Sequence, residues 1–130
     1  MVWHPSKYAE LLAGQLQRHG AQAWLVNTGW TGGGHGVGHR IKLAATRAII
    51  DGIHSGALRD AKMVRDPVFG FDVVTACPGA PPEILVPRNT WADPAAYDAT
   101  ATKLAGLFRE NFKTFAANVS AAVQAAGPTG

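Results

Sequence analysis

Residues 21–55 read AQAWLVNTGWTGGGHGVGHRIKLAATRAIIDGIHS, and this stretch decides the fold class. Its first part, Ala21 to Asn27, is a largely apolar run between glycines, which predicts a short strand. The last part, 41–55, has apolar residues near one face and a glycine after its end, which predicts a helix. The middle part, 28–40, is predicted to be a loop without regular structure, because glycine occupies positions 29, 32, 33, 34, 36 and 38. A strand, a glycine loop and a helix in this order indicate an α/β fold.

Two further helices are predicted on either side of this stretch. Over 6–19, Ser6 is a suitable N-cap and Gly20 is the expected stop. An Asp-Pro pair at 93–94 combines a cap with proline at the first helical position, and it predicts a long helix over 94–119. The apolar residues on one face of the first helix are Tyr8, Leu11, Leu12 and Leu16.

The intervening segment is less regular. Short strands are predicted at Met63 to Val64 and at Phe69 to Ala76. Prolines between 78 and 94 exclude a long helix or a central strand, yet the apolar residues there predict an ordered loop that docks on the core. Cys77 precedes a proline and is interpreted as a packed thiol. The docking residues are Ile84, Leu85, Val86 and Trp91.

The expected architecture is therefore an α/β unit whose helices pack on a small mixed sheet that includes Ala21 to Asn27. Residues 1–119 are expected to form the domain, and the Ala-rich tail 120–130 is expected to be frayed.

Composition limits the classes of function. Charged residues make up only 16% of the chain, below the usual ~25%, so either a larger parent or an oligomer partner covers part of the surface, or the surface is unusually neutral. A net charge of +3 without a basic run makes nucleic acid a poor fit. A single cysteine excludes an internal disulfide framework, no apolar run approaches the ~18 residues of a membrane helix, and no signal peptide is visible. A cytoplasmic location is the expectation that remains.

The glycine loop is the strongest candidate for a ligand site, because loops between a strand and a helix hold anions with backbone N–H groups. Residues 33–40 read G-x-x-x-x-G-H-R, so His39 and Arg40 stand where a phosphate-binding loop has lysine and a hydroxyl residue. The loop alone fits a ligand-binding loop or a structural turn equally well. Arg40 at the predicted start of the helix offers a planar fork of donors, and Thr46 offers a hydroxyl. His35 and His39 have metal-like spacing, but no third ligand lies near them in the sequence.

Several segments resemble the end of ATP-dependent phosphoenolpyruvate carboxykinase, in the right order and over about residues 2–115. They are HPSKYAELL (4–12), WLVNTGWTGG (24–33), GVGHRIKLAATRAIIDGIHSG (36–56), DPVFG (66–70), CPGAPPEIL (77–85) and PRNTWAD (87–93). The resemblance implies a gluconeogenic enzyme of the cytoplasm that converts oxaloacetate and ATP to phosphoenolpyruvate, ADP and carbon dioxide, using Mg²⁺ and commonly Mn²⁺.

Carried over position by position, the resemblance assigns contacts with the adenosine end of ATP to Arg40, Ile41 and Thr46. Backbone contacts from Gly36, Gly38 and His39 are expected beside them. His39 stands where the family usually has lysine.

The resemblance covers roughly the last quarter of the family's length. The phosphate loop, the metal ligands and the mobile lid are therefore expected in a missing N-terminal portion, and the 130-residue chain alone is expected to be inactive. Two alternatives remain open: a non-catalytic nucleotide-binding module, and a structural remnant that packs on a partner.

Overall fold

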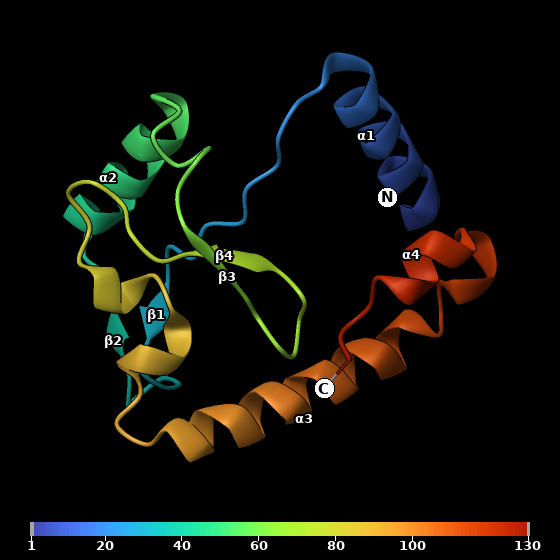
Figure 1. The fold of residues 1–130 in the computed structure, drawn as a ribbon. Helices are drawn as coiled ribbons and strands as arrows, with labels where there is room; N and C mark the ends of the chain where they lie inside the picture. The colour runs from blue at the N-terminus through green and yellow to red at the C-terminus, as the bar shows by residue number, and fades with distance from the viewer. Residues whose placement is uncertain (1, 130) are drawn as a thin grey trace.

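The computed structural model describes residues 2–129 as an open arrangement of helices and two small hairpins. Figure 1 places α1 (Pro5–His19) and α4 (Ala121–Ala125) on one side of the molecule, and α2 (Leu43–His54) and the hairpins on the other. The helix α3 (Pro94–Phe112) runs along the base between them. The α/β class is confirmed, but the elements do not enclose a single core.

The helices begin and end where their capping residues allow. The helix α3 is capped by Asp93, whose side chain accepts a hydrogen bond from the Ala95 N–H, and Pro94 occupies the first helical position as predicted. The N-cap of α1 is His4 rather than the predicted Ser6, because Pro5 already occupies the first position of that helix. Gly20 ends α1 in the left-handed conformation at φ 58°. The helix α3 also ends earlier than predicted, before a 3₁₀ turn, η3 (Ala116–Asn118).

The sheet differs from the expectation of one small mixed sheet. Two separate antiparallel hairpins form, one from β1 (Trp30–Thr31) and β2 (His39–Arg40), the other from β3 (Met63–Arg65) and β4 (Asp72–Val74). The second lies where strands were predicted. Residues 21–27 are not a strand, which corrects the prediction: the apolar run is present, but no described strand pairs with it.

The largest buried cluster lies beside α2. Leu58, Cys77 and Leu85 form its centre, and Leu58 is only 1% exposed. The prediction that Cys77 is a packed thiol is confirmed, and burial raises the pKa of this thiol, so the unreactive protonated form is favoured. The half-buried side chains packed around the cluster include Trp24, Ile49, Ile53, Val74 and Ile84.

The proline-rich segment is ordered, as predicted. It forms two 3₁₀ turns, η1 (Pro82–Ile84) and η2 (Pro87–Thr90), and Leu85 between them is buried. The tail after η3 contains α4, and the Thr129 N–H donates to the Val68 carbonyl at 2.9 Å. Within residues 2–129, no helix has the length and apolar character needed to cross a membrane.

Candidate functional site

The glycine-rich segment forms a hairpin rather than the fully irregular loop that its composition predicts. Trp30 pairs with Arg40 and Thr31 with His39, and the Ile41 N–H donates to the Gly29 carbonyl at 2.9 Å. The hairpin thus delivers the chain directly from the glycine turn into the residues that lead to α2.

Two glycines are required by the tight geometry of this hairpin. A Cβ on Gly38 would lie 2.4 Å from the Gly33 carbonyl oxygen and 2.5 Å from that of Thr31. A Cβ on Gly32, whose φ is +77°, would lie 2.9 Å from the Thr90 carbonyl oxygen. No side chain fits at either position unless the backbone moves. Glycine is therefore needed at Gly38 for the close approach within the hairpin, and at Gly32 for the close approach of the hairpin to Thr90. Gly36 has φ +87° but open space around it.

Arg40 lies on β2, three residues before α2, which corrects the expectation that it stands at the start of the helix. Its register partner is Trp30, and directly opposed residues of an antiparallel pair share one face. The indole of Trp30 meets the His35 ring edge-on, with centroids 5.4 Å apart. An exposed guanidinium, an indole and an imidazole are therefore presented by one small hairpin.

The chain from Arg40 to Thr46 leads into the positive end of α2. Lys42 is the N-cap of this helix and makes no side-chain capping bond, and the first turn contains no acidic residue. Arg40 and Lys42 form no ion pair with any residue in 2–129. The positive potential of the helix dipole therefore adds to that of the two cations, and no acidic side chain in residues 2–129 forms an ion pair with either cation. Thr46 lies in the first turns of α2 and is half-buried, as is Ile41.

The predicted contact residues follow one another along the chain: Gly36 and Gly38 lie in the turn, His39 and Arg40 form β2, Ile41 lies between β2 and α2, and Thr46 lies in α2. What sequence reasoning missed lies far away in the chain. Thr31 is the buried polar residue of the described chain, and its hydroxyl lies 2.7 Å from that of Thr90, 59 residues later. In the sequence, the segment that contains Thr90 stands out only by its resemblance to the carboxykinase family, and no local pattern connects the two threonines.

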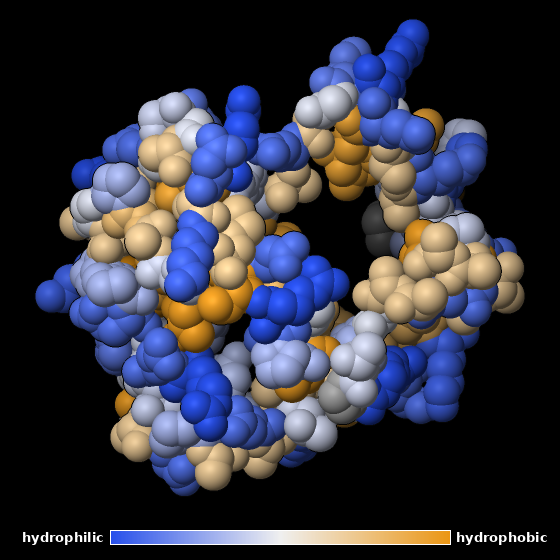
Figure 2. Space-filling view, viewed as in Figure 1, coloured by the Kyte–Doolittle hydropathy of each residue, from blue (hydrophilic) through white to orange (hydrophobic). Residues whose placement is uncertain are grey.

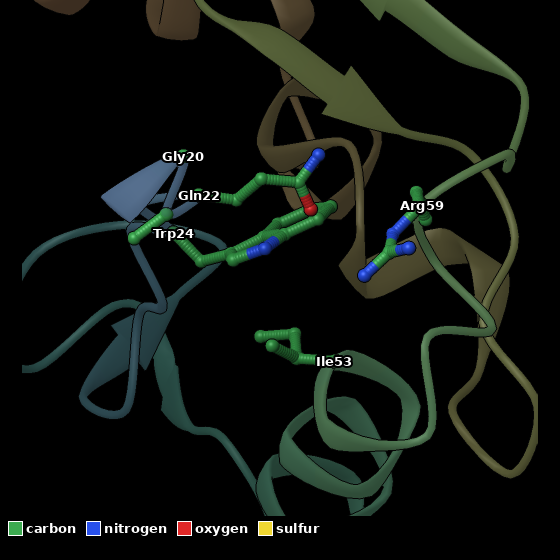
Figure 3. A pocket seen from close by; sticks show the side chains of 6 residues that line it. Gly20, Gln22, Trp24, Ile53 and Arg59 are labelled. Carbon is green, nitrogen blue, oxygen red and sulfur yellow. The ribbon is translucent and has the colours of Figure 1, made fainter. Parts of the chain in front are cut away.

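Two hollows elsewhere contain none of these residues. One of about 500 Å³ lies between the linker after α1 and the end of α2; Figure 3 shows the Trp24 indole over Ile53, with the Arg59 guanidinium facing it. The other, about 340 Å³, lies among β3, β4, η2 and α3. Two of its charged groups pair with each other: the hydrogen bond from Arg88 lowers the pKa of the Asp98 carboxyl.

Metal binding is not supported by the described side chains. Across residues 2–129, no group of three or more His, Cys, Asp or Glu side chains comes together as a metal site would require. The residues present do not fit a Mg²⁺ or Mn²⁺ ion, and no chemical step through a metal can be assigned to them.

Comparison with known proteins agrees with the family resemblance that the sequence shows. The model of the family described as Phosphoenolpyruvate carboxykinase matches residues 1–83. The protein named Phosphoenolpyruvate carboxykinase (ATP) of Dictyostelium discoideum is 61% identical over 128 residues, which cover 98% of this chain and 23% of the relative. Phosphoenolpyruvate carboxykinase (ATP) 2 of Salinibacter ruber is 54% identical over 128 residues, covering 98% of this chain and 24% of the relative. The chain therefore spans about a quarter of the length of the curated relatives it matches.

Proposed function

The chain belongs to the ATP-dependent phosphoenolpyruvate carboxykinase family, and we propose that it forms the adenosine-facing wall of the ATP site in such an enzyme. The reaction is the conversion of oxaloacetate and ATP to phosphoenolpyruvate, ADP and carbon dioxide in cytoplasmic gluconeogenesis. This segment contributes nucleotide contacts to it. The phosphate loop and the Mg²⁺ or Mn²⁺ ligands belong to the portion of the relatives that this chain does not match.

One observation carries the proposal: Arg40, an exposed arginine without an ion pair in residues 2–129, lies on β2 just before the positive end of α2, where Lys42 makes no side-chain capping bond. A guanidinium combines a flat stacking surface with a fixed fork of donors, which suits a nucleobase and ribose better than a point charge does. Ile41 supplies an apolar contact and Thr46 a hydroxyl within the next turns.

The backbone of the glycine turn has a separate role in this proposal. Gly36 carries no side chain that would block a ligand, and its surroundings are open. Gly38 and His39 directly precede Arg40, and we propose that their backbone contacts the nucleotide beside it, although the Gly38 N–H already donates to the Gly34 carbonyl. Close approach of backbone donors to a ligand is what such glycines permit.

The test uses a full-length chimera, in which residues of this chain replace the matching 128-residue segment of the Dictyostelium relative. Arg40→Ala is expected to weaken ATP binding by on the order of 1–3 kcal/mol, the range for a hydrogen bond to a charged group. Arg40→Lys recovers only part of this, because an ammonium does not reproduce a stacked plane. Arg18→Ala, which removes the same charge from α1, is the matched control.

Calorimetry with ATP and steady-state assays with oxaloacetate measure these effects. The affinity for oxaloacetate is expected to change little in every variant. If ATP affinity is the same in Arg40→Ala and in the parent chimera, Arg40 does not contact ATP and the proposal is wrong.

A second candidate is a non-catalytic nucleotide-binding module, and the lack of a metal-ligand group in residues 2–129 favours it for the chain by itself. Our proposal predicts that the 130-residue chain forms no phosphoenolpyruvate and binds ATP no more tightly than roughly millimolar, because the triphosphate stays in water. Micromolar ATP binding by the isolated chain would favour the module instead. If the chain binds no ATP and only packs on the remainder of a carboxykinase, the third reading, a structural remnant, applies.

A further inference from the structure

The β1–β2 hairpin is connected to the distant turn η2 by two linked hydrogen bonds, of which the one between Thr31 and Thr90 is partly buried. The Thr90 hydroxyl donates to the Pro87 carbonyl at 2.7 Å. A hydroxyl has one proton, so the 2.7 Å contact between the two threonine hydroxyls must be a bond that Thr31 donates to Thr90. Thr31 is only 7% exposed, and its hydroxyl therefore depends on Thr90 rather than on water.

A steric contact reinforces the same junction. The space that a Cβ of Gly32 would occupy lies 2.9 Å from the Thr90 carbonyl oxygen and 3.5 Å from the His39 ring. The backbone of the glycine turn therefore rests directly against the end of η2. Figure 1 shows these gold 3₁₀ turns lying beside β1 and β2.

The turn η2 is itself held from its other side. The Arg88 guanidinium donates to both carboxylate oxygens of Asp98 on α3, from Nε at 2.8 Å and from Nη2 at 2.9 Å. The Trp91 and Tyr97 rings meet edge-on with centroids 5.6 Å apart. A two-bond arginine–carboxylate pair fixes orientation as well as distance. The hairpin is thus connected through η2 to the long helix of the molecule.

The geometry of a strand relates this attachment to Arg40. Successive side chains of β1 point to opposite faces, so Thr31 turns toward η2 while Trp30 turns away from it. Trp30 is the register partner of Arg40. The face that carries Arg40 is therefore the reverse of the face that η2 holds, and a shift of the hairpin on η2 would move Arg40 with it.

We propose that Thr31 and Thr90 are positioning residues for nucleotide binding, which hold the β1–β2 hairpin so that Arg40 meets the nucleotide. This inference rests on the proposed function, because it presumes that Arg40 contacts ATP. It adds that ATP affinity depends on the turn at residues 87–90, which contains none of the predicted contact residues.

The test uses the same full-length chimera. Thr90→Val keeps the shape of the side chain but removes the hydroxyl, and it is expected to raise the Kd and KM for ATP roughly 3- to 10-fold, the range for the net contribution of one hydrogen bond. Thr90→Ser keeps the hydroxyl and is expected to restore ATP binding to within about twofold of the parent. The KM for oxaloacetate is expected to stay unchanged, and so is kcat at saturating ATP.

A double-mutant cycle separates positioning from loss of stability. If Thr90 acts through Arg40, then Thr90→Val has a smaller effect on ATP affinity in the Arg40→Ala background than alone. Additive effects, or a lowered melting temperature with unchanged ATP affinity, would overturn the inference. If Thr90→Val yields no soluble protein, Thr31→Val replaces it in the cycle, because Thr90 then keeps its bond to Pro87; unchanged ATP affinity in Thr31→Val contradicts the proposal equally.

The two proposals fail in different ways. No effect of Arg40→Ala on ATP affinity defeats the proposed function. An effect of Arg40→Ala together with no effect of Thr90→Val leaves the nucleotide site in place and defeats only the positioning role of η2.

Discussion

The β1–β2 hairpin and the helix α1 lie at opposite extremes of how this chain is held together. The hairpin has only two residues in each strand, yet it is fixed by Thr90 and by the close approach of Gly32 and Gly38 to backbone oxygens. The helix α1 has fifteen residues, good caps and no buried residue. Its apolar side chains are exposed, Leu12 to 62% and Leu11 to 55%.

The difference shows that a segment can form regular secondary structure without packing against the rest of the chain. Local capping and periodicity are enough to form α1, but they provide nothing for its apolar face to cover. Figure 2 shows apolar residues at the surface near the upper end of the molecule and an opening between that part and the rest. The curated relatives are about four times as long as the segment that they share with this chain, and the covering of this face by a further portion of such an enzyme or by an oligomer partner stays a prediction.

The largest expected effect is on the buried cluster beside α2. Leu58→Ala removes a side chain that is 1% exposed, and it is expected to cost about 2–4 kcal/mol of unfolding free energy through lost burial and the cavity left behind. Leu12→Ala, the same change on α1, is expected to stay within about 0.5 kcal/mol. Urea unfolding of the 130-residue chain measures both. Equal costs would mean that α1 is packed as firmly as the core.

The next effect tests the hairpin itself. Gly38→Ala forces a Cβ against two backbone oxygens and is expected to destabilise the hairpin by about 1–3 kcal/mol. Gly14→Ala places a Cβ in open space within α1 and is expected to stabilise that helix by up to about 1 kcal/mol. Hydrogen exchange at the Ile41 N–H, which bonds to Gly29, reports on the hairpin specifically. Unchanged protection of that amide in Gly38→Ala would show that the close contacts do not hold the strands.

The smallest effect concerns the ion pair that anchors η2. The hydrogen bond from Arg88 lowers the pKa of Asp98, so the folded state favours the ionised carboxylate. The resulting stability is fully present above the pKa of an unfolded aspartate, about 3.9, and is lost as the pH falls through the lower folded pKa. Both side chains are about half exposed, so the change is small.

Melting temperatures at pH 6 and pH 3 measure it, with Asp98→Asn as the variant. The difference between parent and variant is expected to shrink at pH 3. Glu10→Gln, which breaks the exposed Lys7–Glu10 pair within α1, is the control, and its melting temperature is expected to stay close to that of the parent at both pH values. A parent-to-Asp98→Asn difference that is independent of pH would contradict the role of the charge.

Local patterns in the sequence were sufficient for the elements that depend on neighbouring residues. The helices α1, α2 and α3 were placed correctly within a few residues, apart from the early end of α3, because caps and apolar spacing act within a turn or two. The β3–β4 hairpin and the ordered proline-rich segment were also predicted. Arg40, Ile41 and Thr46 could be named from the sequence because they match a motif of the family that the chain resembles; their contact with ATP stays a prediction.

The sequence by itself therefore determined the α/β class, the helices and the family to which the chain belongs. Only the tertiary structure decided that Ala21 to Asn27 is not a strand and that Thr31 is bound to Thr90. The physical reason is the same in both cases. A strand requires a backbone partner and a buried hydroxyl requires an acceptor, and either partner can come from any distance along the chain. Which distant groups meet is settled by packing, not by the residues next to them.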